Sequence, residues 1–427
     1  MRRLRPCRLG LLGVMLFLAA GAGAAFGAGA AEARTSPRAA LSASLGRLFA
    51  AAGGGGGGLV RDLSTGRTLY SRKPDIRRLP ASVEKIYTTS TSLARMGADG
   101  TLTTRILGVG QVSGGVWSGT LYLRGGGDPT FGSASYDRYA YGTGATIQTL
   151  VANLIEQYGI TAVSGRVIGD ESYFDGNRGT PATGNALSAD VEGELSGLAF
   201  DRGFADEQGS AFQAWPPLFA AQQLASALRT RGVTLLPGLR VGAGRTPDTA
   251  VPLASVSSPK LATIAELTNS PSDNYLAEML LKGLGARYGS AGSTLAGASV
   301  VRAQLAASFG IHPALDDGSG LSRDDRTSPR DVVTALTGLA SNPAFVDSLS
   351  IAGVRGTMQS GLARTSAARR CQGKTGTLHD VANLVGYCTA ADHHRLVFAF
   401  MLNSVTNPAA GHADEDRMAV SVARYSG

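Results

Sequence analysis

The chemistry of this sequence starts from a Ser-x-x-Lys pair, Ser82 and Lys85. A serine hydroxyl becomes a good nucleophile when a neighbouring base takes its proton, and a buried lysine with a depressed pKa can do this. Pro80 comes just before the pair, and its fixed φ suits the first turn of a helix. We therefore expect Ser82 near a helix N-terminus and Lys85 on the same helix face. Alone, the pair proves little, because Ser-x-x-Lys occurs by chance in many proteins.

Two later motifs could complete an acyl-transfer site. Ser272 and Asn274 belong to a Ser-Asp-Asn run, and Lys374 opens a Lys-Thr-Gly-Thr run. Acyl transfer needs a nucleophile, a base, a proton path to the leaving group and donors for the oxyanion. We expect Ser272 to relay a proton to the departing amine and Asn274 to hold a substrate amide. Lys374 would supply positive charge for a substrate carboxylate and tune the proton network.

The rest of the Lys-Thr-Gly-Thr run is expected to bind substrate through Thr375, Gly376 and Thr377. Gly376 lies on the same strand face as Lys374, where a side chain would block the cleft. The backbone N–H groups of Ser82 and Thr377 would form an oxyanion hole, in which each donor is typically worth about 3 kcal/mol. For the Ser-Asp-Asn run alone, a helix N-cap is the simpler interpretation, and Asp273 is expected to be structural.

The elements around these motifs indicate a discontinuous domain. Helix-like and strand-like segments at 41–102 and 251–427 carry all three motifs, and residues 103–250 alternate short strands and helices without a catalytic cluster. We interpret 103–250 as one or two inserted domains. A strand-turn-strand pattern with its hairpin at 62–67 follows six consecutive glycines, 53–58. The glycine run fits a weakened strand or a flexible linker, and both interpretations remain open.

Length and composition bound the class of protein. With 427 residues, 43% hydrophobic and 17% charged, the chain is globular and long enough for two or three domains. A basic start, an apolar core at 9–20 and a small-residue stretch predict a signal peptide over 1–33, and hence an exported protein, periplasmic or associated with the cell wall. For cleavage before Glu32, four of the 40 Lys and Arg are removed and all 32 Asp and Glu stay, so the net charge falls from +8 to about +4. Scattered basic residues without interleaved aromatics argue against nucleic acid.

Export leaves two cysteines, Cys371 and Cys388, which an oxidising compartment would allow to pair. Both are equidistant from a turn centred between His379 and Asp380. In a regular hairpin they would therefore be directly opposite on neighbouring strands. We predict a disulfide that clamps the strand carrying Lys374; two free buried cysteines are the alternative.

The three motifs in this order form the signature set of serine β-lactamases and penicillin-binding proteins. More specifically, the chain resembles the class C low-molecular-mass penicillin-binding proteins, the D-alanyl-D-alanine carboxypeptidase/endopeptidase family. The resemblance covers about residue 41 to the C-terminus, includes the gap of 190 positions between Ser82 and Ser272, and rests on the segments 79–82, 121–129, 272–274, 317–323 and 373–377. Family members usually carry apolar residues where the glycine run stands.

The resemblance implies an α/β (α+β) fold, a transpeptidase-like domain with a five-stranded sheet flanked by helices and smaller inserted domains. It implies a serine-type peptidase without a metal or other cofactor, which cleaves the terminal D-Ala–D-Ala bond of peptidoglycan stem peptides and often their D-Ala–diaminopimelate cross-links. It also implies acylation by β-lactam antibiotics. Arg323 is expected to meet the carboxylate of the stem's third residue.

Other functions remain possible at this point. A β-lactamase would differ by fast deacylation, and a catalytically silent wall-binding or β-lactam-sensing protein would need no turnover. The complete set of catalytic residue types argues against the silent protein. The histidines lack H-x-x-x-H spacing, which disfavours a zinc carboxypeptidase. The glycines at 125–127 lack the Gly-Lys-Ser/Thr ending of a phosphate-binding loop, so we expect a structural turn there.

Overall fold

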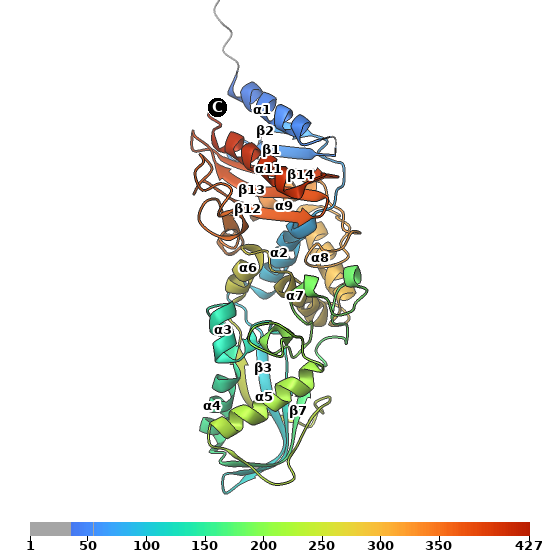
Figure 1. The fold of residues 1–427 in the computed structure, drawn as a ribbon, viewed down its shortest axis with the longest axis vertical. Coiled ribbons are helices and arrows are strands. Elements are labelled where there is room, and N and C mark those ends of the chain that lie inside the picture. The colour runs from blue at the N-terminus through green and yellow to red at the C-terminus, as the bar shows by residue number, and fades with distance from the viewer. Residues whose placement is uncertain (1–35, 54) are drawn as a thin grey trace, which may run out of the picture. The chain divides into compact units, whose positions relative to one another are not determined.

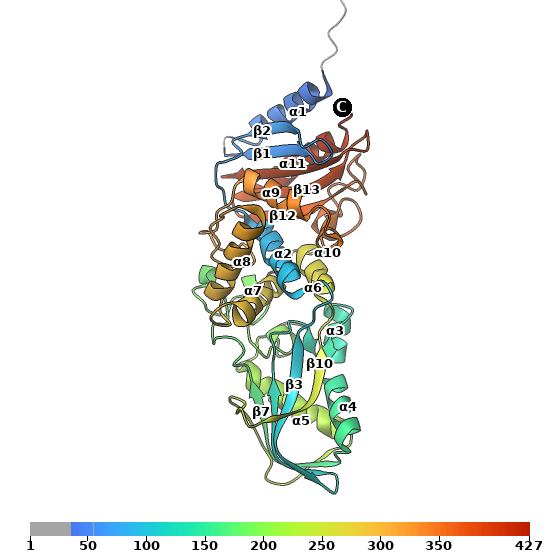
Figure 2. The same cartoon turned by 180° about the vertical axis from the view of Figure 1, so that it is seen from behind.

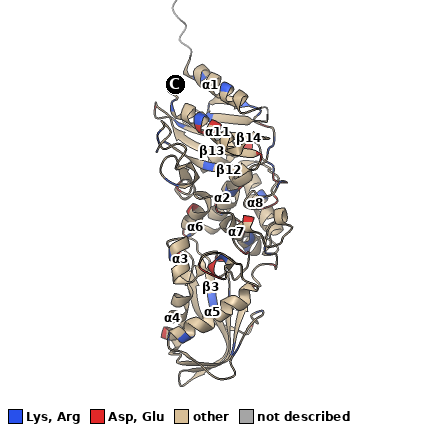
Figure 3. Ribbon diagram, viewed as in Figure 1, with Lys and Arg blue, Asp and Glu red and all other residues tan. Residues whose placement is uncertain are grey.

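The computed structural model describes residues 36–427 except residue 54, and the predicted signal segment lies outside them. Helices and strands are mixed along this part of the chain, which contains two large sheets (Figures 1 and 2). The predicted α/β class is confirmed. Within the described residues, the helices are too short or too polar to span a membrane. Charges of both signs are spread over both sheets and their helices rather than gathered in one block (Figure 3).

The first sheet is antiparallel throughout, with the order β11-β12-β13-β14-β1-β2. The expected sheet had five strands, and the sixth is the two-residue β11. The strands are β1 (Gly57–Asp62), β2 (Thr68–Arg72), β11 (Ser350–Ile351), β12 (Cys371–Leu378), β13 (Val381–Thr389) and β14 (Arg395–Asn403).

Helices cover both faces of this sheet. On one face lie α1 (Pro37–Ala51) and α11 (Pro408–Ala423), and on the other face α9 (Pro329–Leu339) packs on the sheet (Figures 1 and 2). Helices α2 (Lys85–Met96) and α8 (Thr294–Phe309) contribute to the same hydrophobic core as α9. Along β14, Phe398 and Phe400 belong to the core under α1 and α11, and Val397 and Ala399 belong to the core under α9. Successive side chains of a strand point to opposite faces, so a strand buried on both sides must be apolar throughout.

The glycine run ends inside the sheet. Gly57 and Gly58 begin β1, which pairs with β14 on one side and with β2 on the other. A Cβ on Gly57 would stand 2.5 Å from the guanidinium carbon of Arg78, and a Cβ on Gly58 would stand 2.6 Å from the Phe49 ring. Both contacts are closer than packed atoms tolerate. At this end of β1 the core is therefore filled by side chains from other segments, and the strand interpretation holds for 57–58.

The hairpin of β12 and β13 follows the expected register. Cys371 lies directly opposite Cys388, and the two form a disulfide, as predicted. Lys374 is three residues further along β12 and pairs with Val385. The disulfide thus joins the strand that carries Lys374 covalently to its neighbour.

The second sheet is built from the segment between Thr103 and Ser257. Its order is β10-β3-β4-β7-β8, with β9 also paired to β7. Helices α4 (Ile147–Tyr158) and α5 (Pro216–Thr230) pack on one face of it. The strands are β3 (Thr103–Ser113), β4 (Val116–Arg124), β7 (Ala162–Asp170), β8 (Thr234–Leu235), β9 (Arg240–Ala243) and β10 (Val251–Ser257).

The remaining elements are short or lie between the two sheets. Helices α6 (Leu261–Asn269) and α7 (Asn274–Tyr288) follow the second sheet in sequence and pack on α2. The other elements of the described residues are α3 (Ala134–Ala140), α10 (Pro343–Val346), the pair β5 (Phe131–Gly132) and β6 (Ala145–Thr146), and five single-turn 3-10 helices. Of these 3-10 turns, η1 (Ala81–Glu84) and η3 (Ala189–Val191) contribute to the site described next.

Candidate active site

Ser82 lies in a 3-10 turn rather than in an α-helix. The turn η1 covers Ala81–Glu84, and α2 begins only at Lys85. In a 3-10 helix the side chains at i and i+3 are eclipsed, so Lys85 stands directly over Ser82. Ala81 has φ of 48°, a left-handed conformation that costs energy outside glycine. The sequence correctly predicted the shared face, and the structure corrects the type of helix.

The Lys85 ammonium nitrogen has three oxygen neighbours. Its Nζ lies 3.0 Å from Ser82 Oγ, 2.6 Å from Asn274 Oδ1 and 2.7 Å from the carbonyl oxygen of Ser319. The amide and carbonyl oxygens only accept hydrogen bonds, whereas the serine hydroxyl can also donate. A neutral lysine would therefore give its two N–H groups to Asn274 and Ser319 and keep its lone pair for the proton of Ser82.

The environment of Lys85 favours this neutral form. The side chain is fully buried, and burial lowers its pKa from 10.5 to about 8 against the opposing pull of Asp317, Glu278 and other carboxylates. An amine with a pKa near the working pH can both take and return a proton. Lys85 thus has the geometry and the basicity of a general base.

Asn274 is held from two sides. Its Oδ1 accepts from Lys85, while its Nδ2 donates to the carbonyl of Asp190 at 2.8 Å and its backbone N–H donates to Glu192 at 2.9 Å. Asp190 and Glu192 lie at η3, within the expected insertion. No catalytic signal is visible in the sequence of this segment, so these two contacts were not predicted. They fix which end of the Asn274 amide faces the lysine.

Asp273 is structural, as expected. Its carboxylate accepts from Leu276 N and caps α7. It also forms a bidentate ion pair with Arg202, whose guanidinium lies 4.8 Å from the ring centre of Tyr275.

Lys374 and Ser272 form a second lysine–serine pair. Lys374 Nζ lies 2.7 Å from Ser272 Oγ and 2.9 Å from the carbonyl of Thr375. Burial lowers the pKa of Lys374 well below its usual value, and the charge of Lys85 lowers it further. Ser272 has φ of 74°, so both site serines stand in or beside a strained residue. These two lysines and two serines are the residues between which protons can move.

Gly376 is required by a close backbone approach. A Cβ there would lie 2.5 Å from the carbonyl oxygen of Pro80 and 3.2 Å from the backbone nitrogen of Val83. The space next to Gly376 is therefore occupied by the turn that carries Ser82, and this contact is why a side chain cannot be accommodated. The glycine lets β12 run directly along the Ser82 turn.

The two threonines of the motif lie on either side of Gly376. Thr375 donates its hydroxyl to Thr357 at 2.8 Å, and Thr377 Oγ1 lies 2.7 Å from His412 Nε2. His412 was not identified from the sequence, where it looks like a surface histidine of the last helix. It is only partly exposed and holds Glu415 through Nδ1 at 3.0 Å.

Arg323 already has a carboxylate partner in this structure. Its guanidinium makes two hydrogen bonds to Asp380, at 2.9 and 3.0 Å, on the turn between β12 and β13. The side chain is half exposed.

The loop before Arg323 belongs to the site. The carbonyl of Ser319 is a Lys85 partner, and its backbone N–H donates to buried Glu278 at 2.8 Å. Gly320 has φ of 84° and packs against the Ala81 carbonyl, where a Cβ would lie within 1.9 Å. The glycines of this loop were visible in the sequence, but a backbone carbonyl acting as a ligand leaves no residue signature.

A turn-borne serine, a buried lysine with a lowered pKa and a second lysine–serine pair define the chain as a serine hydrolase of the acyl-enzyme kind. Its sequence matches the D-Ala-D-Ala carboxypeptidase 3 (S13) family over residues 42–194 and 205–425. The chain belongs to this family and is a peptidase.

Two relatives match most of the chain. Carboxypeptidase DacB of Mycolicibacterium smegmatis is 30% identical over 370 residues, covering 81% of this chain and 76% of that protein. A D-alanyl-D-alanine carboxypeptidase of an Actinomadura species is 27% identical, covering 86% and 81%.

Solved structures share the fold. Penicillin-binding protein 4 of Haemophilus influenzae superposes with a TM-score of 0.71 at 19% identity, over 89% of this chain and 99% of that one. The same protein in complex with a β-lactam gives a TM-score of 0.67 at 18% identity, over 88% and 97%.

Proposed function

We propose that the chain hydrolyses the terminal D-Ala–D-Ala bond of peptidoglycan stem peptides through an acyl-enzyme on Ser82. The observation that carries the proposal is the set of three oxygens around Lys85 Nζ, two of which can only accept hydrogen bonds. This set leaves the lysine lone pair for the Ser82 proton. Family membership supplies the reaction class, and the roles below belong to this chain's own residues.

In the first half-reaction, neutral Lys85 takes the Ser82 proton as Oγ attacks the carbonyl carbon of the penultimate D-Ala. The oxyanion is bound by the backbone N–H groups of Ser82 and Thr377, since Gly376 lets the strand lie against the Ser82 turn. When the tetrahedral intermediate collapses, the C–N bond breaks and the departing amine takes a proton from Ser272. Lys374, at 2.7 Å from Ser272 Oγ, replaces that proton.

Before the second half-reaction, the proton that Lys85 took from Ser82 passes to Lys374, which gave one up to Ser272, so Lys85 is neutral again. Water then gives a proton to Lys85 and attacks the ester carbonyl. The Ser82 ester bond then breaks and Ser82 Oγ regains its proton, which restores the free enzyme. Asn274 keeps one amide hydrogen beyond its bond to Asp190, and this hydrogen can bind a substrate amide. Thr375, Thr377 and Lys374 would receive the terminal carboxylate. Arg323 would meet the stem's third residue only by exchanging Asp380 for the substrate carboxylate.

The same site would acylate with β-lactams and cleave D-Ala–diaminopimelate cross-links, because both present an acyl group to Ser82. We also propose that the chain works outside the cytoplasm, after export by its first 33 residues. In this proposal the peptidase domain consists of residues 41–102 and 251–427, and the insertion consists of residues 103–250. The pairing of β10 with β3 extends the second sheet to Ser257, a few residues beyond that boundary.

The test compares the wild type with Ser82→Ala, using fluorescent penicillin and then a stem pentapeptide. We expect stable labelling and D-Ala release, both lost in the variant. Rapid penicillin turnover would instead indicate a β-lactamase, and labelling without D-Ala release would indicate a β-lactam sensor. Failure of the wild type to label or to release D-Ala would contradict the proposal.

A further inference from the structure

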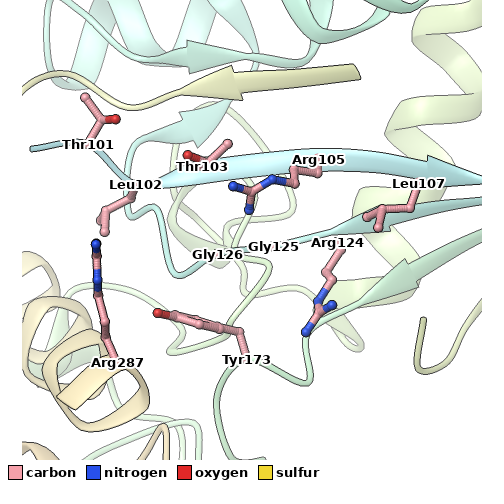
Figure 4. Close-up of a pocket in the computed structure, with 10 residues that line it drawn as sticks. All are labelled: Thr101, Leu102, Thr103, Arg105, Leu107, Arg124, Gly125, Gly126, Tyr173 and Arg287. Atoms are coloured by element: carbon pink, nitrogen blue, oxygen red, sulfur yellow. The ribbon is translucent and has the colours of Figure 1, made fainter. Parts of the chain in front are cut away.

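A charged cavity lies outside the catalytic site, at the end of the second sheet nearest α7. Its volume is about 480 Å³, and it is lined by the start of β3, the end of β4, the loop after β7 and the last turn of α7 (Figure 4). Three of its lining side chains are arginines, Arg105, Arg124 and Arg287, and among the described residues none of the lining ones is acidic. The peptidase mechanism uses none of them.

Two of these arginines are forced together by the strand register. Arg105 and Arg124 are directly opposite each other on β3 and β4, so their side chains leave the same face of the sheet. Like charges in directly opposed positions destabilise a sheet. Alternate residues of β3, including Thr103 and Leu107, line the cavity, whereas Ile106 belongs to the core under α4 and α5 on the other face. The pair therefore stands on the face that those helices leave uncovered.

The nearest carboxylate compensates only part of this charge. Asp170 lies 3.8 Å from Arg124, but its oxygens already accept backbone N–H bonds from Ser172 and Thr246 at 2.9 and 2.8 Å. Arg105 has no such partner within the part of the chain that the structure describes. The cavity thus holds a surplus of positive charge that the fold itself does not neutralise.

Arg287 approaches from the opposite wall, with Tyr173 between it and Arg124 (Figure 4). All three guanidinium groups act on the Tyr173 hydroxyl: burial raises the pKa of Tyr173, and the charges of Arg287, Arg105 and Arg124 oppose that rise. An arginine in the last turn of a helix also stabilises the helix dipole, which would explain Arg287 alone. The helix dipole does not explain why Arg105 and Arg124, a cross-strand pair, face the same cavity.

We propose that this cavity binds an anionic polymer of the cell wall, through carboxylate or phosphate oxyanions that bridge Arg105, Arg124 and Arg287. Guanidinium groups suit both oxyanions because their N–H groups form a planar fork. The Tyr173 and Thr103 hydroxyls add hydrogen bonds, and Leu107 offers an apolar surface for a sugar ring or peptide stem. The inference rests on the proposed action on peptidoglycan.

The cavity and the catalytic site lie at the two ends of one helix. Asn274 is the first residue of α7 and Arg287 is near its last turn, so the helix separates them by about 20 Å. A wall polymer held at the arginines would keep stem peptides close to Ser82 without occupying the cleft. We therefore expect the arginines to raise the rate of hydrolysis of insoluble wall and not that of a small soluble peptide.

The test measures sedimentation with purified, insoluble peptidoglycan. All proteins carry Ser82→Ala so that the wall is not digested, and the variant adds Arg105→Gln, Arg124→Gln and Arg287→Gln. A matched control adds Arg229→Gln, Arg231→Gln and Arg240→Gln, exposed arginines of α5, its C-terminal end and β9, with the same change in charge. Peptidoglycan is used before and after hydrofluoric acid removes phosphodiester-linked polymers. A melting curve verifies that each protein is folded.

We expect the pocket variant to bind about tenfold more weakly than the control, and binding by the control to fall as salt is added. Binding that survives hydrofluoric acid identifies carboxylates as the ligand groups, and binding lost after it identifies phosphates. Equal binding by the pocket variant and the control would overturn the proposal.

Turnover of a soluble pentapeptide separates this inference from the proposed function. With Ser82 restored, the pocket variant should release D-Ala at the wild-type rate. If the wild type itself releases none, the peptidase proposal fails whatever the sedimentation shows.

Discussion

His412 Nε2 lies 2.7 Å from Thr377 Oγ1, on the strand that also carries Lys374. Burial lowers the pKa of His412 and raises that of Glu415 well above its usual value. A neutral Glu415 would donate to Nδ1, and the Nε2 hydrogen would then be donated to Thr377. In that arrangement the hydrogen of the Thr377 hydroxyl would point away from the histidine, free for a substrate carboxylate. Thr377 is positioned by a partly exposed histidine and a buried glutamate on the last helix.

Replacing His412 by leucine should lower kcat/KM for a stem pentapeptide about tenfold, because the Thr377 hydroxyl loses its fixed orientation. Thr377→Val should cost a similar factor. Since both changes act on one hydroxyl, the double variant should be little worse than either single one. Steady-state kinetics of the three variants checks this. Fully additive losses would mean that His412 acts independently of Thr377.

Acylation should depend on the protonation of Lys85. Because burial lowers its pKa to about 8, the neutral base becomes more populated as pH rises through that value. The second-order rate of labelling by fluorescent penicillin should therefore increase between about pH 6 and about pH 9 and then level off. Lys85→Arg keeps the charge and cannot give up its proton, so it should be unreactive throughout. A flat wild-type profile would exclude Lys85 as the base.

Glu84, in the turn that carries Ser82, belongs to a cluster of buried carboxyl groups with Glu278, Asp317 and Asp325. Burial and mutual repulsion raise the pKa of Glu278 to about 8 and that of Asp325 to about 9, and raise that of Glu84 well above 4.5. The folded protein therefore retains protons that the unfolded chain releases above about pH 5. The stabilisation by these neutral carboxyl groups is complete in acid and is lost as pH rises through about 8 to 9.

Glu84→Gln should remove part of this loss of stability at alkaline pH. Neither Glu84 oxygen has a hydrogen-bond partner within the described residues, so the amide should be tolerated near neutral pH. We expect a smaller fall in melting temperature between about pH 6 and about pH 9 than in the wild type. Glu156→Gln, at an exposed position of α4, is the control and should follow the wild type. An unchanged slope in Glu84→Gln would show that Glu84 is ionised in the folded protein.

The motifs allowed five candidate site residues to be predicted because each motif is local in sequence. Ser82 and Lys85 are one helical turn apart, and Ser272 and Asn274 flank Asp273, the N-cap residue of α7. The cross-strand disulfide was predictable for a similar reason, since a regular hairpin fixes its register. Spacing within one element is readable without knowing the fold.

The missed parts depend on contacts between distant segments. Asp190 and Glu192 reach Asn274 across more than 80 positions, and Ser319 acts through its backbone carbonyl, which every residue has. The glycine run was undecidable for the same reason, because the groups that exclude a Cβ belong to Phe49 and Arg78. Only the folded chain brings these groups together.

Two glycines of the N-terminal region should respond oppositely to alanine. Gly58→Ala places a Cβ 2.6 Å from the Phe49 ring and should destabilise the protein by about 1–3 kcal/mol. Gly46→Ala, inside α1 with nothing within 4 Å of its Cβ, should stabilise by about 0.5–1 kcal/mol. Chemical denaturation of both variants measures the difference. Two equal effects would mean that the run behaves as a linker.

The contacts of Asp190 and Glu192 with Asn274 limit how the chain can be engineered. Deleting the insertion to obtain a minimal enzyme would release the amide that orients Lys85, even if the first sheet still folded. Chimeras that exchange insertions between relatives would need a matching acceptor carbonyl and a matching carboxylate at this junction. In such a library, the loop at 190–192 has to be inherited together with the helix that begins at Asn274.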